Sequence, residues 1–415
     1  MKLMYLTSML PFGSKEAFFL PELEELQRVG TEVVVVPMWP RGEQLHGFKI
    51  SLHVLRAPLV SLRILLGAFI STIRAPIRTI QAVSLVFGSR SCRILLKNCA
   101  VVPKALWLAG QARHLGVNHI HAQWAATSAT CAMIASIVAD LPWTMTAHRW
   151  DIREDNLIGE KMRRARGVRA ISRMGAEALS TVCPSRASIV RVGRVGVRVP
   201  AVAAPMRADR KELVLLTTAN LVEVKGHSYL LEALALVRRR GFDVRVEFAG
   251  DGQLRKPLAE HSQRLGLGNV VTFLGVVPHE ALLSDLVSGR WDAVVLPSIR
   301  TEDGEEEGIP VALMEAMAAG VPIIATRTGA IGELVDEGAG ILVPEREPHA
   351  IQEAIASLYD LGVAARIASA GRARIAHEYE VSRTARALMA MINEERPSKS
   401  SPSVALKEGS ERGSA

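Results

Sequence analysis

The stretch EEEGIPVALMEAMAAGVPIIATRTGAIGEL, residues 305–334, indicates how the C-terminal half of this chain folds. Pro310 suits the first position of a helix because its missing N–H has no partner there, and Gly320 suits the end. The stretch therefore predicts a helix over 310–319. Residues 323–326 then have the pattern of a buried strand.

Glu315 is the only ionisable residue between Gly308 and Thr326, in a helix that is otherwise apolar on all sides. Such a helix is normally buried, and a buried carboxylate needs hydrogen-bonding partners. We expect Glu315 to face a polar group. The alternative is that it bonds only the neighbouring backbone.

The first turn of this helix has free backbone amides around Gly308 and Ile309, which form a site for anions. Glu307 lies just before these amides. One acid is therefore expected at the mouth of a site and the other, Glu315, about two turns along the helix. The alternative is that Glu307 belongs to a solvated acidic loop over residues 302–307.

Length and composition favour a globular protein of two or slightly more domains. The chain has 415 residues, 49% of them hydrophobic and 22% charged, which is too long for one ordinary core. The N-terminus has no signal-peptide pattern, and the cysteines match no metal or redox spacing. We expect them to be reduced core thiols of a cytosolic protein: Cys92, Cys99, Cys131 and Cys183.

The charge is unevenly distributed along the chain. Residues 1–210 contain 28 Lys and Arg against 13 Asp and Glu, a balance of +15, whereas the remainder contains 22 against 29, a balance of −7. These balances add to the net charge of +8. The two halves are therefore electrostatically different.

The basic charge is concentrated in an apolar segment. From Gln44 to Ala139 there is no Asp or Glu, yet there are ten Lys and Arg. Four arginines are spaced so that they fall near one helix face, although prolines at 58 and 76 would kink such a helix: Arg56, Arg63, Arg74 and Arg78.

This composition favours contact of residues 44–115 with an anionic membrane surface. No uninterrupted apolar run reaches the roughly 18 residues that a membrane span needs. The alternative is a helix that packs on its own domain and exposes a solvated basic face. Nucleic acid is disfavoured as a partner because few aromatic residues interleave the charges and no binding motif is present.

The N-terminal half predicts a doubly wound α/β domain. Residues 3–6, 16–29 and 32–36 alternate between strand, helix and strand periodicity. His148 directly follows a strand predicted over 143–147, and open α/β sheets bind ligands at that end of their strands. The alternative is a surface histidine.

A second α/β domain follows a proline-rich linker expected over 201–212. Lys225 lies at a strand-to-helix turn on the same sheet edge as the Glu307 loop, which makes it a candidate for phosphate binding. Gly250 and Gly252 follow another predicted strand and permit a tight turn with close backbone approach.

Several ordered segments resemble the retaining glycosyltransferases of family 4. In the C-terminal half they are Glu307 and Glu315 within EGIPVALMEAMAAGVPIIAT, GDGQLRKPL at 250–258 and VTFLGVVPHE at 271–280. In the N-terminal half, three segments look like the branch that builds bacterial exopolysaccharides such as colanic acid: EAFFLPELEEL at 16–26, HIHAQWA at 119–125 and TAHRWDI at 146–152.

The resemblance implies the GT-B fold, in which two Rossmann-like doubly wound domains face each other across a cleft. Residues 1–200 would form the acceptor domain and residues 213–378 the nucleotide-sugar domain. A last helix over 379–394 would return to the first domain. The tail over 395–415 lies outside the resemblance and has a composition typical of disorder.

The resemblance also implies roles for individual residues. Glu307 would bond hydroxyls of the donor sugar, Glu315 the ribose and Lys225 the diphosphate, with His148 near the reacting end of the sugar. The donor is expected to be a UDP- or GDP-sugar, held without a bound metal. The other implied donor-side residues are Asn220, Gly250, Gly252, Gly308, Ile309 and Pro310, and the acceptor-side residues are Glu16, His121, Arg149 and Asp151.

One departure from the family pattern is Asn220 in TTANLVEVKG, where members usually carry an arginine. Asparagine can donate a hydrogen bond but brings no charge. Either another residue such as Arg149, Arg153 or Arg300 supplies the missing cation, or turnover is weak.

The leading hypothesis is a retaining glycosyltransferase at the inner face of the plasma membrane. It would add a sugar to a lipid-linked or polysaccharide acceptor during exopolysaccharide biosynthesis. Two alternatives are a protein that binds a nucleotide sugar without turnover and a sugar-nucleotide epimerase.

Overall fold

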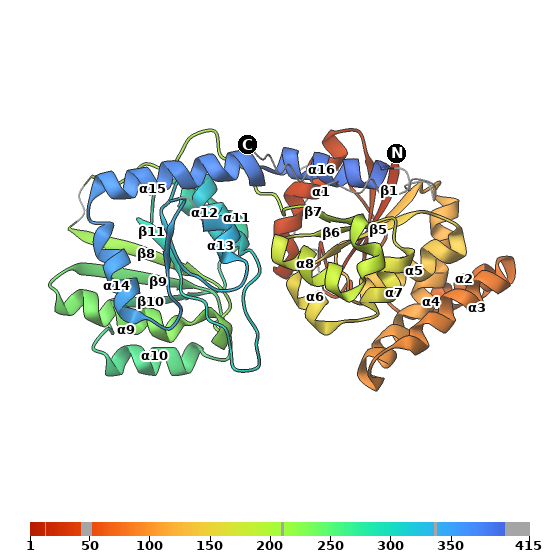
Figure 1. Cartoon of the computed structure of the whole chain (residues 1–415), viewed down its shortest axis with the longest axis horizontal. Coiled ribbons are helices and arrows are strands. Elements are labelled where there is room, and N and C mark those ends of the chain that lie inside the picture. The colour runs from red at the N-terminus through yellow and green to blue at the C-terminus, as the bar shows by residue number, and fades with distance from the viewer. Residues whose placement is uncertain (13, 43–51, 209–210, 336–337, 395–415) are drawn as a thin grey trace, which may run out of the picture.

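The computed structural model describes residues 1–12, 14–42, 52–208, 211–335 and 338–394, and it consists of two α/β domains (Figure 1). Two sequence expectations fall partly or wholly outside the described residues. They are the start of the basic segment, through residue 51, and the tail over 395–415.

The N-terminal domain is built on a seven-stranded sheet of the order β3-β2-β1-β4-β5-β6-β7. Every pairing in it is parallel. Helices cover both faces, so the inner strands β1, β2, β4, β5 and β6 are almost entirely buried, whereas the edge strands β3 and β7 are partly exposed. The strands are β1 (Lys2–Thr7), β2 (Glu32–Pro37), β3 (His53–Val54), β4 (His119–Ala122), β5 (Trp143–Ala147), β6 (Gly167–Ala170) and β7 (Val190–Val192).

The helices of this domain include a long basic group that follows β3. In chain order the helices are η1 (Ser14–Phe19), α1 (Leu20–Arg28), α2 (Leu62–Arg74), α3 (Pro76–Ser84), η2 (Leu85–Gly88), α4 (Cys92–His114), α5 (Thr127–Ala139), α6 (Arg149–Glu154), α7 (Ile158–Arg164), α8 (Arg173–Val182) and η3 (Pro184–Ile189). Figure 1 shows α2 and α3 at the outer end of the domain, on the side away from the C-terminal domain.

The C-terminal domain has a six-stranded parallel sheet of the order β10-β9-β8-β11-β12-β13. Its strands are β8 (Glu212–Thr218), β9 (Asp243–Ala249), β10 (Val271–Gly275), β11 (Ala293–Leu296), β12 (Ile323–Thr326) and β13 (Ile341–Val343). Its helices are η4 (Glu223–Lys225), α9 (His227–Arg239), α10 (Arg255–Arg264), α11 (His279–Val287), α12 (Val311–Ala319), α13 (Ile331–Val335), α14 (Pro348–Ser357) and α15 (Leu361–Arg374), followed by the π-helix η5 (Ile375–Tyr379).

Both sheets are doubly wound, which confirms the predicted fold class. The strand order reverses between β1 and β4 in one sheet and between β8 and β11 in the other. Ligands of open α/β sheets bind outside the carboxyl ends of the strands at such reversals. Each domain therefore has one expected ligand-binding edge.

The chain crosses between the domains twice. The first crossing lies between β7 and β8. The sequence predicts a linker over residues 201–212, which ends where β8 begins. On the second crossing, α15 lies on the C-terminal domain while α16 (Val381–Asn393) contacts α1 of the N-terminal domain (Figure 1). The two crossings are joined by hydrogen bonds, from the Val197 N–H to the Tyr379 carbonyl at 2.8 Å and from the Val381 N–H to the Val197 carbonyl at 3.0 Å.

The structure corrects two local predictions. Helix α12 begins at Val311, and Pro310 caps it in an extended conformation instead of forming its first turn. The basic arginines do not share one helix, because Arg56 precedes α2 and Pro76 separates α2 from α3.

The expectation for the cysteines is wrong in part. Cys131 and Cys183 are buried, whereas Cys92 and Cys99 are exposed on α4. These two lie on the solvent side of an amphipathic helix, which the apolar local sequence did not reveal.

A buried ion pair links α1 to β6 beneath the carboxyl edge of the N-terminal sheet. The Arg169 guanidinium donates to the Glu22 carboxylate at 2.6 and 3.2 Å, and the two side chains are only 2% and 0% exposed. The Tyr5 hydroxyl donates to the same carboxylate at 2.6 Å, and the Thr146 hydroxyl accepts from Arg169 at 3.0 Å. Both charges are therefore compensated inside the domain.

We predict that Arg169→Met lowers the free energy of unfolding by about 3–5 kcal/mol, because it leaves the Glu22 carboxylate buried without its partner. Chemical denaturation followed by circular dichroism would measure this. Arg163→Met is the matched control, since Arg163 forms an ion pair with Glu160 at the surface of the same domain. It should cost less than about 1 kcal/mol. Equal losses in the two variants would contradict the prediction.

Candidate functional site

The centre of the candidate site is an ion pair between Lys225 and Glu307. The Lys225 ammonium lies 2.6 Å from a Glu307 carboxylate oxygen, and the two side chains are 19% and 12% exposed. Lys225 comes from the turn after β8, and Glu307 comes from the loop before α12. The sequence placed both residues at one sheet edge, and the structure brings them into direct contact.

Glycines allow the backbone segments around this pair to approach closely. A Cβ on Gly329 would lie 1.9 Å from the Glu307 carbonyl, and a Cβ on Gly226 would lie 2.0 Å from the Pro297 carbonyl. Both glycines also have positive φ angles, which L side chains rarely adopt. The loops that carry Lys225 and Glu307 are therefore held tightly against their neighbours.

Gly250 and Gly252 lie at the adjoining turn after β9. A Cβ on Gly250 would lie 1.9 Å from the Ala219 carbonyl, and one on Gly252 would lie 2.5 Å from the Leu221 carbonyl. The turn thus contacts the backbone on both sides of Asn220. Asn220 is exposed, and its backbone carbonyl lies 3.2 Å from His227 Nε2.

Glu315 contacts a histidine from the neighbouring helix. His279 Nε2, at the start of α11, lies 2.6 Å from a Glu315 carboxylate oxygen. The hydrogen bond that His279 donates to the Glu315 carboxylate raises the pKa of His279, although burial opposes this shift. Sequence reasoning missed His279 as a site residue, even though it falls at a strand-to-helix turn within the VTFLGVVPHE segment.

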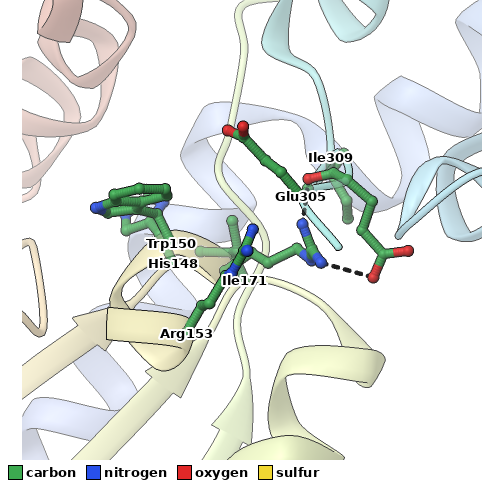
Figure 2. Close-up of a pocket in the computed structure, with 9 residues that line it drawn as sticks. His148, Trp150, Arg153, Ile171, Glu305 and Ile309 are labelled. Carbon is green, nitrogen blue, oxygen red and sulfur yellow. Dashed lines mark hydrogen bonds and ion pairs between the residues drawn. The ribbon is translucent and has the colours of Figure 1, made fainter. Parts of the chain in front are cut away.

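A pocket of about 200 Å³ lies between the domains (Figure 2). From the N-terminal domain, it is lined by the loop after β5 together with α6, and by Ile171 after β6. From the C-terminal domain, it is lined by residues just before α12, namely Glu305, Glu306, Gly308 and Ile309. Figure 2 shows His148, Trp150 and Arg153 on one side of it and Glu305 and Ile309 on the other. The pocket includes the donor-side residues Gly308 and Ile309, with Pro310 next in the chain.

Two arginines from α6 bridge the domains at this pocket. Arg149 donates to a Glu306 carboxylate oxygen at 2.7 Å and also to the Glu306 backbone carbonyl. Arg153 donates to the Asp303 carboxylate at 3.2 Å. Arg300 lies on the other side of Glu306, 3.3 Å from its second oxygen. Arg149, Arg153 and Arg300 are the three residues that we considered as replacements for the family arginine at position 220. All three contact acidic residues of the 303–306 loop.

His148 lies at the N-terminal-domain side of the pocket with one nitrogen unpaired. Its ring stacks at 4.1 Å from the Trp124 ring and packs edge-on against Phe19. Its Nε2 is buried and has no hydrogen-bonding partner among the described residues. Burial lowers the pKa of His148 to about 3, and the charge of Arg169 acts in the same direction. The imidazole is therefore neutral at physiological pH, with one nitrogen available to a ligand.

Glu16 has a supporting role behind His148. Its carboxylate accepts the backbone N–H groups of Ser8 and Leu10 at 2.9 and 2.8 Å, and also the N–H of Met9. It also accepts the indole N–H of Trp124, the ring that stacks on His148. Glu16 thus orders the loop after β1 and the aromatic support of His148 at the same time.

The two other acceptor-side residues lie inside the N-terminal domain. The His121 imidazole is fully buried, lies 2.8 and 3.0 Å from the hydroxyls of Thr144 and Thr146, and has a pKa well below its usual range because of burial. The Asp151 carboxylate accepts the N–H groups of His148 at 3.1 Å and Ala125 at 2.9 Å. Burial raises the pKa of Asp151 to about 7. Both residues support the edge of the sheet from within and do not face the pocket.

Among the described residues, no three His, Cys, Asp or Glu side chains gather in an arrangement that could hold a metal ion. The cationic groups at the site are Lys225 and the arginines around Glu306. The site also contains the N-terminal end of the nine-residue helix α12.

Comparison with known proteins supports the interpretation of the C-terminal domain. Residues 203–374 match the family model described as "Glycosyl transferases group 1". The chain is 34% identical over 181 residues to WcaL of Escherichia coli K12, which is named as a glycosyltransferase of colanic acid biosynthesis. It is 33% identical over 171 residues to the amylovoran biosynthesis glycosyltransferase AmsK of Erwinia amylovora. These matches cover 42% and 41% of this chain and 43% and 41% of those relatives.

The whole chain is similar to solved structures at the level of fold. It aligns with Anabaena HepE in complex with UDP and glucose at a TM-score of 0.69 and 20% identity, covering 94% of this chain and 98% of HepE. This likeness, with the two doubly wound domains and the returning helix, identifies the fold as GT-B.

The buried neutral state of His148 predicts acid sensitivity. The unfolded chain protonates this imidazole below about pH 6.5, whereas the folded protein does so only below about pH 3. The free energy of unfolding should therefore fall as the pH is lowered through this window, by up to about 1.4 kcal/mol per pH unit from His148. Urea unfolding at pH 7, 6 and 5 would measure this. The free energy of unfolding should fall less per pH unit in His148→Asn than in the wild type. An equal fall in the two proteins would mean that His148 is charged in the folded protein.

Proposed function

We propose that the protein is a retaining glycosyltransferase of exopolysaccharide biosynthesis. It transfers a sugar from a nucleotide-diphosphate sugar to a lipid-linked or polysaccharide acceptor. The observation that carries the proposal is the Lys225–Glu307 ion pair. Glu307 lies between Glu306 and Gly308, which line the pocket from the C-terminal domain, and His148, whose Nε2 is unpaired among the described residues, lines it from the N-terminal domain. The group 1 match over residues 203–374 and the UDP bound by HepE support a nucleotide-sugar donor.

The donor diphosphate takes the place of the Glu307 carboxylate beside Lys225. A diphosphate carries more negative charge than a carboxylate, so it competes well for the single ammonium group. Once released, the Glu307 carboxylate is free to accept hydrogen bonds from hydroxyls of the donor sugar. Glu315, held by His279, is placed to bond the ribose.

Transfer requires the sugar–oxygen bond to the diphosphate to break, so negative charge grows on the leaving group. Lys225 and the free amides at the start of α12 are already in place to stabilise that charge without reorganising. We propose that these groups suffice without a bound metal ion. The neutral His148 contributes a hydrogen bond near the reacting end of the sugar.

The proposal places the enzyme at the anionic inner surface of the plasma membrane. Helices α2 and α3 bury only a narrow face, and large apolar side chains are exposed next to exposed arginines. Patches of this kind mark protein or membrane interaction sites. No helix in the described part of the chain combines the length and hydropathy of a membrane span. The exposed apolar residues of α2 and α3 are Leu62, Leu65, Leu66, Phe69, Ile70, Ile73, Ile77 and Ile80.

Asn220 favours a second candidate, a protein that binds the nucleotide sugar without efficient turnover. The side chain is exposed at the donor edge and brings no charge, and the nearby arginines are engaged by acids of the 303–306 loop. This candidate shares the donor site and differs only in the rate of transfer. Independent measurements of nucleotide-sugar binding and of nucleotide release therefore distinguish the two candidates.

We predict that Lys225→Met lowers the rate of nucleotide release from UDP- or GDP-sugars in the presence of lipid-linked acceptors by about 10²–10³-fold, because one fixed charge at the leaving group is lost. EDTA should leave the wild-type rate unchanged. Lys256→Met is the matched control, because Lys256 is exposed on α10 and takes no part in the Lys225–Glu307 ion pair.

Two outcomes separate the candidates. If Lys225→Met releases nucleotide as fast as Lys256→Met, the role of Lys225 is wrong; if the wild type neither binds nor releases nucleotide from any UDP- or GDP-sugar, the proposed function fails. If calorimetry finds donor binding but no release, and Asn220→Arg restores release, the second candidate is correct.

We predict that Phe69→Ser combined with Ile73→Ser weakens binding to phosphatidylglycerol-rich vesicles by about tenfold or more, since each large apolar side chain contributes about 1.5–3 kcal/mol when buried. Co-sedimentation would measure this, and high salt should weaken it further. These side chains are 63% and 62% exposed. Val202→Ser with Val276→Ser is the control, with exposures of 75% and 73% elsewhere on the chain. Equal binding by both double variants would exclude this membrane surface.

A further inference from the structure

A second cavity, which we call the β2–β3 groove, lies at the carboxyl edge of the N-terminal sheet. It encloses about 470 Å³, within the range of small-molecule sites, and is lined by residues 38–41 after β2 and by residues 56 and 58–60 after β3. Its lining combines apolar side chains such as Trp39 and Leu59 with Arg41 and Arg56, and none of the described residues that line it carries a carboxylate.

The two arginines of the groove are oriented by aromatic rings. The Arg56 guanidinium lies 4.5 Å from the centre of the Phe12 ring and donates to the Gly42 carbonyl at 3.0 Å. The Arg41 guanidinium lies 6.0 Å from the Trp39 ring. Within the part of the chain that the structure describes, neither arginine forms an ion pair with a carboxylate. Both retain N–H donors in the planar arrangement that suits phosphate.

A buried lysine adds a third positive charge behind the groove. Lys104 is fully buried, and its ammonium donates to the carbonyls of Pro37 at 2.6 Å, Met38 at 3.0 Å and Ala57 at 2.8 Å. It therefore ties the two walls of the groove together. Burial lowers the pKa of Lys104 to about 8, so the ammonium is still mainly charged at neutral pH.

The groove adjoins the exposed apolar helices. Its last lining residue, Val60, is 55% exposed and is followed by Ser61, which caps α2, and then by the exposed Leu62. A ligand with a charged head in the groove thus meets an apolar surface immediately outside it. This combination fits an amphiphile better than a free anion.

Hydrogen bonds connect the groove to the pocket at His148. The Trp39 N–H donates to the Ser8 carbonyl at 2.9 Å, and the Ser8 N–H donates to Glu16 at 2.9 Å. Glu16 also holds the Trp124 ring that stacks on His148. The groove and the pocket therefore share one sheet edge.

We propose that the β2–β3 groove binds the phosphate head group of a lipid-linked acceptor, with Arg41 and Arg56 as its ligands and the lipid chain along α2. The inference rests on the proposed function. Of the two acceptor classes given there, lipid-linked and polysaccharide, it selects the first and specifies a phosphate-bearing lipid. The acceptor sugar attached to that phosphate would then extend along the sheet edge towards His148.

The test measures flotation of the full chain with two kinds of vesicle of matched surface potential. One contains polyprenyl monophosphate in phosphatidylcholine, and the other contains phosphatidylglycerol. The wild type should prefer the first by about tenfold, the factor expected for one added hydrogen bond to a charged group. Arg41→Gln combined with Arg56→Gln should abolish the preference. The control is Arg74→Gln combined with Arg93→Gln, which removes two exposed charges outside the groove. It should weaken binding to both kinds of vesicle by the same factor.

Stabilisation by UDP in thermal unfolding separates this inference from the proposed function. The groove variant should keep the wild-type UDP shift, which shows that it folds and that its donor domain is intact. If the wild type shows no shift with UDP or with GDP but prefers the phosphate lipid, the proposed function fails and the groove site stands. If the wild type binds both vesicles equally, or the groove variant keeps the preference, the inference is overturned.

Discussion

The ion pair between Lys225 and Glu307 is the contact on which the site depends. It joins the turn after β8 to the loop before α12, and both groups are largely withdrawn from water. Withdrawing two charges from water is costly unless each keeps its partner. A ligand that offers the ammonium a stronger partner can therefore exchange with the carboxylate, and the same event leaves the carboxylate free to accept other hydrogen bonds.

The two domains are held together by contacts of a similar, exchangeable kind. Arg149 and Arg153 reach acids of the opposing loop, and Glu333 accepts the N–H groups of Arg173 and Met174 at the start of α8 at 2.8 and 2.9 Å. The pocket between them, about 200 Å³, is smaller than the roughly 300–1,000 Å³ of typical ligand sites. A ligand of the typical size therefore fits between the domains only if they separate partly. Exposed pairs such as Arg153–Asp303 oppose this only weakly, by about 1 kcal/mol or less.

Local patterns predicted much of the fold, whereas contacts between distant residues could not be predicted. The alternation of strands and helices and the turn glycines led to two doubly wound domains. The partner of Glu315 is His279, 36 residues earlier, and their contact depends on how α11 packs beside α12. The burial of His121 could not be predicted either. When a strand is covered on both faces, its sequence does not indicate which polar residue points into the domain. The β2–β3 groove depends on the parallel pairing of β2 with β3, and β3 is only two residues long.

The return of α16 to the N-terminal domain has a consequence for synthesis on the ribosome. Leu388, Met391 and Ile392 share a hydrophobic core with Leu23 and Leu26 of α1. Domains generally fold as they emerge, the N-terminal one first. Here the apolar face of α1 stays uncovered until residue 393 has left the exit tunnel. The nascent N-terminal domain must therefore remain unaggregated while the entire second domain is translated, and a chain that stopped at residue 378 would keep this face exposed.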